Sequence, residues 1–232
     1  MKILNIAAYK FISFDESSLV TLQSRCRQKA AELAIKGTIL LSTEGINLML
    51  AGEPRNIAPF KQFLKEETPV GELTYKESFS DNFPFLRLFV RVKLEIISMG
   101  CPEIKPAEKT APYLSPEMLR QWYRDKKEMI VLDVRNDYEV EAGHFTTALD
   151  LNLQTFREFP DALDQLSENI KIKPIVTYCT GGIRCEKAAA LMLARGFQEV
   201  YQLDGGILNY LERCGDEFYA GDCFVFDNRG VL

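Results

Sequence analysis

The residues best placed to do chemistry lie between a short apolar run and an Ala-rich, helix-forming stretch. Cys179 ends the apolar run, and Arg184 begins the Ala-rich stretch. The loop between them consists of Thr180, Gly181, Gly182 and Ile183. A strand–loop–helix order directs backbone N–H groups and the positive end of a helix dipole at the cysteine sulfur. Because such surroundings stabilise a thiolate, we predict that Cys179 is a nucleophile rather than an inert buried thiol.

The composition of this loop favours a site that carries sulfur. Converging N–H groups can hold a thiolate and then the terminal sulfur of a Cys–S–S⁻ persulfide. Gly181 and Gly182 permit the positive φ angles and close backbone approach that such a loop needs, and Arg184 adds fixed charge. Cysteine phosphatases use a longer loop, in which the arginine would fall at position 185, and here that residue is Cys185. The shorter loop argues against phosphate chemistry.

Other polar residues near this loop have two interpretations each. Cys185 is a second thiol that could resolve a persulfide as a disulfide, or could pack as a small residue at the helix start. Asp133 and Arg135 end a buried run, and we predict that they brace the loop. His144 is the single histidine, and we expect it to hydrogen-bond locally rather than act as a base. A catalytic triad is therefore not predicted.

The segment that holds these residues reads as a parallel α/β domain over residues 114–215. Short apolar strands alternate with helices, which is typical of a parallel sheet covered on both faces. The predicted strands are Ile130–Val134, Pro174–Tyr178 and Glu199–Leu203, and the predicted helices begin near Pro116, Pro160 (to Asn169) and Cys185 (to Arg195). Proline-rich residues 98–113 are expected to be a linker, and residues 216–232 a C-terminal tail.

Residues 1–97 read as a separate α+β domain. The expected order is strand, helix, strand pair, helix, strand, at residues 3–12, 17–36, 38–50, 54–67 and 86–94. This order suits a ferredoxin-like sandwich in which two helices cover one face of an antiparallel sheet. In the last segment Leu86, Leu88, Val90, Val92 and Leu94 alternate with polar residues, so we expect them on one face.

The other face of that last segment carries a candidate RNA contact. It presents Arg87, Phe89, Arg91 and Lys93. Basic residues on either side of an aromatic ring can hold a single strand by phosphate contacts and base stacking. The alternative is an ordinary solvated strand face.

Three sequence blocks in the second half resemble the rhodanese domains. The active-site loop from Cys179 to Arg184 is one of them. The others are Leu132-Asp-Val-Arg135, with Glu139 and Gly143-His144, and the closing segment Gly196–Ile207. Since the blocks occur in order over most of the predicted α/β domain, the resemblance implies a rhodanese fold with Cys179 as the persulfide-forming residue.

The whole chain resembles a narrower family. An acylphosphatase-like module containing Gly37–Asn47 precedes the rhodanese-like part, as in the bacterial rhodanese-type tRNA uridine hydroxylases. The resemblance implies oxygen-dependent formation of 5-hydroxyuridine at the wobble position of tRNA, with molecular oxygen as co-substrate. Members of that family continue past the Cys223–Asp227 segment into a cysteine-rich region, whereas this sequence stops at Leu232. A sulfurtransferase and a non-catalytic RNA- or protein-binding module are the alternative functions.

The composition narrows the remaining choices. A net charge of −5 over 232 residues gives no overall sign of nucleic-acid binding. The six cysteines show no disulfide framework, and one histidine leaves little material for a zinc site. No apolar run is long enough to span a membrane and the first residues lack a signal-peptide pattern, so we expect a cytoplasmic protein. The expected partners are tRNA and a sulfur donor; no resident cofactor is identifiable.

Overall fold

The structure is a computed structural model that describes residues 2–226, 229 and 230. The chain divides into two compact units, Met1–Ile97 and Ser98–Leu232. Each unit has its own five-stranded sheet, mostly antiparallel in the first and wholly parallel in the second. The predicted fold class, an α+β part followed by a parallel α/β part, is confirmed.

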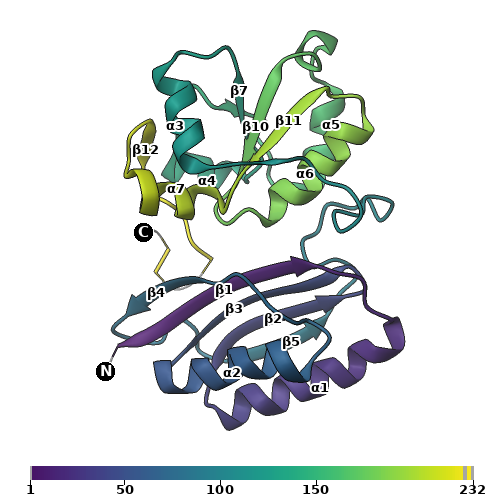
Figure 1. Ribbon diagram of the computed structural model, residues 1–232, viewed down its shortest axis with the longest axis vertical. Coiled ribbons are helices and arrows are strands. Elements are labelled where there is room, and N and C mark those ends of the chain that lie inside the picture. Colours follow the sequence, from purple (N-terminus) through teal and green to yellow (C-terminus); the bar gives the residue numbers. More distant parts are fainter. Residues whose placement is uncertain (1, 227–228, 231–232) are drawn as a thin grey trace. The chain divides into compact units, whose positions relative to one another are not determined.

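The first unit is a sheet with both of its helices on one face (Figure 1). Its strands are β1 (Ile3–Phe11), β2 (Lys36–Ser42), β3 (Gly45–Gly52), β4 (Lys76–Ser80) and β5 (Leu88–Val92), and its helices are α1 (Glu16–Glu32) and α2 (Pro54–Glu67). The strands lie in the order β4-β1-β3-β2-β5. Alternate apolar side chains of the strands meet the helices in a buried core that includes Ile39, Leu48 and Phe60.

The two edge strands of this sheet differ from the expectation. Strand β4 pairs antiparallel with β1 and completes the ferredoxin-like strand order. Its sequence Lys-Glu-Ser-Phe-Ser lacks the apolar alternation from which a strand is predicted. Strand β5 pairs parallel with β2 at the other edge, so the sheet is mixed rather than wholly antiparallel. Leu86 and Leu94 are 79% and 95% exposed because the strand stops short of both. The predicted apolar face is therefore buried only around Val90, which is 3% exposed.

Helix α1 fixes the orientation of β5. The side chains of Gln23 and Arg27 donate hydrogen bonds of 2.8 and 3.0 Å to the Val90 carbonyl oxygen. Val90 is in register with Ile39 on the helix-covered face, and Phe89 is in register with Thr38 on the opposite face. The alternation of a strand thus turns Phe89 and Arg91 away from the helices.

The second unit is a parallel sheet in the order β6-β11-β10-β7-β9. Its strands are β6 (Tyr113–Leu114), β7 (Ile130–Asp133), β9 (Leu149–Asp150), β10 (Pro174–Tyr178) and β11 (Glu199–Leu203), while β8 (Gly143–Phe145) and β12 (Tyr219–Gly221) form a separate antiparallel pair. The helices are α3 (Pro116–Arg124), α4 (Asp137–Ala142), α5 (Phe159–Asp164), α6 (Ile183–Ala194) and α7 (Gly206–Cys214). In Figure 1, α3 and α7 lie on one side of the sheet and α5 and α6 on the other.

Most of the predicted elements of this unit are present, with one correction. The Ser115 hydroxyl caps α3 by accepting a 3.2 Å hydrogen bond from the Met118 N–H, as its Ser-Pro-Glu start suggests. The helix expected over Pro160–Asn169 ends at Asp164, and a 3-10 turn (Glu168–Ile170) follows. The helix is shorter because the residues after Asp164 are mostly polar. Among them, Ser167 and Asn169 can hydrogen-bond to the backbone and so disfavour a helix interior.

Two parallel strands bring the candidate site residues to one edge of the sheet. Strands β7 and β10 are neighbours, with Asp133 in register with Tyr178. Their carboxyl ends therefore open side by side, the position at which ligands bind in open α/β sheets. Residues that follow the domain expected to end at 215 also pack here, because β12 pairs with β8 and the Tyr219 ring contacts Phe145 at 5.2 Å.

Candidate active site

Cys179 lies directly after β10, and its sulfur faces the loop that leads into α6. The Gly182 N–H donates a 3.0 Å hydrogen bond to Cys179 Sγ. Gly182 has φ of +101°, a conformation that favours glycine and that turns this N–H toward the sulfur. Of the two loop glycines, Gly182 is the one that the structure places in this left-handed region. The side chain of Cys179 is fully buried.

The surroundings of Cys179 favour its thiolate. Burial alone would raise the pKa of Cys179, but a hydrogen bond from the Cys185 thiol, the positive charge of Arg184, and the Gly182 and Arg184 N–H groups hold this pKa well below its ordinary value. The pKa of Cys185 moves the other way, because burial and the neighbouring Cys179 sulfur both raise it. We therefore assign the negative charge to Cys179 and the proton to Cys185.

The first residues of α7 hydrogen-bond to the Cys179 loop. The N–H groups of Ile207 and Leu208 donate hydrogen bonds of 3.0 and 3.2 Å to the carbonyl oxygens of Cys179 and Thr180. Gly206 allows this close approach, because a Cβ built on it would lie 2.4 Å from the Cys179 carbonyl oxygen. Since these two carbonyls are engaged by α7, the loop can present its N–H groups to the sulfur. In the sequence Gly206 is part of the rhodanese-like closing segment, and no local pattern indicates its contact with Cys179.

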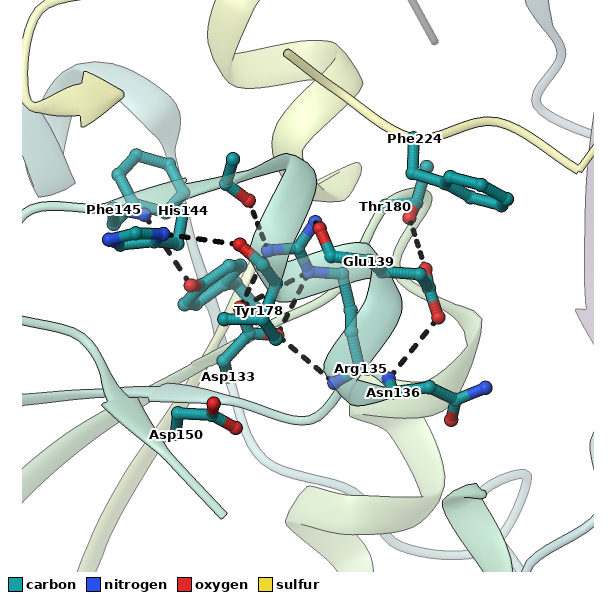
Figure 2. Close-up of polar contacts among 12 residues, drawn as sticks. Asp133, Arg135, Asn136, Glu139, His144, Phe145, Asp150, Tyr178, Thr180 and Phe224 are labelled. Atoms are coloured by element: carbon teal, nitrogen blue, oxygen red, sulfur yellow. Dashed lines mark hydrogen bonds and ion pairs between the residues drawn. The ribbon is translucent and has the colours of Figure 1, made fainter. Parts of the chain in front are cut away.

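A buried carboxylate anchors Arg184. The Glu139 carboxylate accepts hydrogen bonds of 2.5 and 2.7 Å from the Arg184 guanidinium and one of 3.1 Å from the Thr180 hydroxyl. Figure 2 shows the Thr180–Glu139 contact, together with the hydrogen bond from the Asn136 N–H to Glu139. Arg184 is buried; burial would lower its pKa, but Glu139 and Cys179 raise it, so the arginine stays charged.

Glu139 belongs to this site although its sequence surroundings do not indicate it. It lies within a rhodanese-like motif, but a Glu in the acidic segment Asp137–Glu141 looks like a solvated helix position. A faint signal existed, since Asn136 precedes Glu139 by the spacing of a helix-start motif, and the Asn136 N–H does donate to Glu139 at 3.2 Å.

Asp133 and Arg135 form a second buried ion pair. The Arg135 guanidinium contacts the Asp133 carboxylate at 2.7 Å and donates to the carbonyl oxygens of Glu139 and Gly143 at 3.1 and 2.6 Å (Figure 2). Arg135 thus fixes the α4–β8 backbone that carries Glu139, and its guanidinium also lies over the ring of Tyr178, the residue directly before Cys179. Burial raises the pKa of Asp133 although Arg135 opposes the shift.

The hydrogen-bond contact of the His144 ring is local and does not involve Cys179. One ring nitrogen is 3.2 Å from the Val140 carbonyl oxygen, a local contact within the α4–β8 segment. The predicted RNA-contact residues lie in the first unit, and Arg87, Phe89, Arg91 and Lys93 are all exposed. Arg91 lies over the Phe89 ring, 4.6 Å from its centroid. All four residues belong to the first unit.

Two further observations concern metal binding and membrane insertion. Within residues 2–226, 229 and 230, the structure has no cluster of three His, Cys, Asp or Glu side chains that could hold a metal ion. Over the same residues, no helix is both long and apolar enough to cross a membrane. The site, as far as described, consists of one thiolate, one thiol and a buried Arg–Glu pair.

Comparisons with known families divide the chain where its two units divide. Residues 3–96 match the UPF0176 acylphosphatase like domain, and residues 115–213 match the rhodanese-like domain. Among solved structures, the rhodanese-like domain of an Anabaena protein matches with a TM-score of 0.40 and 22% identity, over 47% of this chain and 79% of that structure.

Curated proteins of one name match along almost the whole chain. The tRNA uridine(34) hydroxylase of Cupriavidus pinatubonensis is 45% identical over 100% of this chain and 83% of its own length. The protein of the same name from Delftia acidovorans is 46% identical over 99% of this chain and 89% of its own length.

Proposed function

The chain belongs to the tRNA uridine(34) hydroxylase family, and we propose that Cys179 is the residue through which it modifies uridine 34 of tRNA. The stabilised negative charge on the Cys179 sulfur supports this proposal. A fully buried cysteine keeps a pKa well below its ordinary value because a second thiol, an arginine and two N–H groups stabilise its charge. Activated cysteines of this kind serve as nucleophiles.

The reaction proposed for the chain is the oxygen-dependent formation of 5-hydroxyuridine. Family membership supports the enzyme class and the tRNA substrate. Molecular oxygen as co-substrate remains part of the proposal, and labelling with heavy-isotope oxygen gas tests it. The 5-hydroxyuridine should carry the label when the gas is heavy and should not carry it when only the water is heavy. We further propose the cytoplasm, where tRNA is, as the place of action.

The same sulfur is suited to carry a persulfide. A Cys179 thiolate that attacks the outer sulfur of thiosulfate forms Cys179–S–S⁻ and releases sulfite, with charge and atoms balanced. Gly182 N–H, Arg184 and the Cys185 thiol would then surround an anion one atom longer than the thiolate. This property supports a sulfurtransferase as the second candidate function. Mass spectrometry tests it directly, because a persulfide adds about 32 Da to the Cys179 peptide.

The open face of β5 is the proposed contact for RNA in the first unit. Phe89 is 42% exposed and Arg91 lies over its ring, an arrangement that leaves a cationic and aromatic surface for a nucleotide. Arg87 and Lys93, also exposed, would extend this surface along the strand with phosphate contacts. Replacing Arg91 by Gln should weaken tRNA binding and make it less dependent on salt, whereas Cys179 alkylation should not change.

The decisive test is nucleoside mass spectrometry of tRNA from cells that lack this protein and any redundant enzyme. Wild-type protein should restore 5-hydroxyuridine, and Cys179→Ala should not. Cys26→Ala is a matched control, because Cys26 is equally buried but lies in the core of the first unit. Restoration by Cys179→Ala would refute the assignment, and would favour a non-catalytic RNA- or protein-binding role.

A further inference from the structure

Three aromatic side chains gather beside the Cys179 loop without belonging to the buried core. We call Tyr138, Phe224 and Phe226 the aromatic rim. Tyr138 lies in α4, whereas Phe224 and Phe226 follow β12, so segments far apart in sequence meet here. The Phe224 ring is 5.2 Å from Tyr138 and 5.3 Å from Phe226, both in edge-to-face geometry.

The aromatic rim lies next to Arg184 and Glu139, the ion pair beside the Cys179 sulfur. The Arg184 guanidinium lies over the Phe226 ring, 5.5 Å from its centroid. Tyr138 directly precedes Glu139, the partner of Arg184. Figure 2 shows Phe224 above the hydrogen bond between Thr180 and Glu139. The rim is therefore connected to the active-site loop through both members of its ion pair.

The exposure of the rim contrasts with that of other rings in the same unit. Phe145 and Tyr210 form a similar edge-to-face contact at 4.7 Å, but both are fully buried. Tyr138 and Phe226 are 42% and 44% exposed. Each ring that stays exposed forfeits part of its transfer free energy and keeps surface available for a ligand. An edge-to-face contact with Phe224 also occupies at most one face of the Tyr138 ring.

We propose that the aromatic rim stacks against the uracil base of the target nucleotide and holds it at the mouth of the Cys179 site. This inference rests on the proposed function and names the groups that bind the base. An enzyme that modifies a base must take the base out of its stack, and aromatic side chains then replace the lost neighbours. Every base has a π-face, so stacking supplies affinity, while the loop supplies the reactive atom.

The nearby charges fit a neutral base better than a phosphate. Arg184 is the cation closest to the rim in the contacts described, and its guanidinium is already engaged by the Glu139 carboxylate. A phosphate would meet Glu139 behind that arginine. A planar, uncharged uracil can lie on Tyr138 without displacing the ion pair, so the same Arg184–Glu139 contact persists when RNA binds.

The test measures binding of an anticodon stem-loop RNA to the full chain. Its probes are one RNA with uridine at position 34 and one that is abasic there. Stacking is worth about 1–3 kcal/mol per base, so Tyr138→Ala should raise the Kd for the uridine RNA about 5- to 150-fold. Tyr138→Phe, which keeps the ring, should bind like wild type. The abasic RNA should bind wild type and Tyr138→Ala equally weakly.

Two controls separate the rim from the rest of the molecule. Phe79→Ala removes a 57% exposed ring from β4 of the first unit and should leave the ratio of uridine to abasic affinity unchanged. The alkylation rate of Cys179 should be the same in Tyr138→Ala as in wild type, which shows an intact site. Phe226→Ala serves as the second rim variant and should also reduce the ratio.

Each other outcome overturns the proposal in an identifiable way. Equal preference for uridine over abasic RNA in wild type, Tyr138→Ala and Phe226→Ala would refute the rim while leaving the proposed function intact. Slower persulfide loading from a protein donor, with unchanged RNA affinity, would assign the rim to a protein partner instead. A wild-type protein that forms no 5-hydroxyuridine would refute the proposed function, whatever the binding data show.

Discussion

Cys26 and Cys179 are both fully buried, yet their thiols have opposite acidities. Cys26 lies in the core of the first unit, where burial raises its pKa to about 12 and the charge of Arg25 opposes this only weakly. Cys179 lies between a strand and a helix of the second unit, and its pKa falls well below the ordinary value. Burial therefore does not by itself decide the charge state of a cysteine. Directed N–H groups, a second thiol and a nearby arginine can outweigh desolvation.

The two sites also differ in what supports them. Around Cys26 the neighbours are apolar side chains of the α1 core. Around Cys179, α7 engages the loop carbonyls, and Glu139 engages Arg184. The Cys179 site is therefore a network of polar contacts in which each charged group has a partner of opposite charge or a hydrogen-bond donor. Removing one member should disturb it more than any single change at the Cys26 site.

The largest effect is expected from neutralising Glu139. Glu139→Gln removes the charge that compensates buried Arg184, so the free energy of unfolding should fall by about 3–5 kcal/mol in urea denaturation. Glu168→Gln is the matched control, because its ion pair with Lys171 lies at the surface with Glu168 82% exposed. That variant should unfold like wild type. Equal stability of all three proteins would contradict the role given to the buried pair.

Gly206→Ala should have the next largest effect. Gly206 has φ of +68°, where a side chain costs about 1–2 kcal/mol, and its new Cβ would also overlap the Cys179 carbonyl oxygen. Gly196→Ala has a similar φ of +86° but nothing within 4 Å of the added atom. We expect both variants to lose stability, and only Gly206→Ala to slow Cys179 alkylation by iodoacetamide. The same alkylation rate in both would show that α7 does not position the loop.

Removing the second thiol should give the smallest effect. Cys185→Ala deletes a hydrogen bond to the Cys179 thiolate, so the pKa of Cys179 should rise. A hydrogen bond is worth about 0.5–1.5 kcal/mol, which predicts alkylation about two- to tenfold slower at pH values below the pKa of Cys179, where the thiolate fraction limits the rate. Cys185→Ser keeps a donor and should restore most of the rate. If Cys185→Ala reacts as fast as wild type, Cys185 packs as a small residue and does not tune Cys179.

The sequence was most informative where chemistry and secondary structure coincide in a few adjacent residues. The strand predicted at Pro174–Tyr178 is β10, and the helix predicted after the loop is α6, beginning two residues earlier than expected. Glycines, an apolar run and an Ala-rich stretch are local signals, and they are read without knowledge of tertiary contacts. The strand–loop–helix order of this region is therefore confirmed.

What the sequence could not supply depends on contacts between distant segments. Glu139 is fully buried and pairs with Arg184, which lies far along the chain. Strand β4 has a polar sequence, since an edge strand need not bury either face completely. Phe224 lies in a segment expected to be a tail, but its ring contacts Tyr138 of α4. No local pattern distinguishes β4 or Phe224 from solvated segments, and the helix-start spacing of Asn136 and Glu139 is a faint signal at best.

The ultraviolet absorbance of the thiolate, followed against pH, tests most directly whether the loop rather than burial sets the state of Cys179. The thiolate signal of Cys179, taken as wild type minus Cys179→Ala, should appear at a pH well below the ordinary range of a cysteine. The signal of Cys26, taken as wild type minus Cys26→Ala, should appear only toward pH 12. A Cys179 signal that appears only in alkaline solution, like that of Cys26, would show that burial sets the state of both thiols.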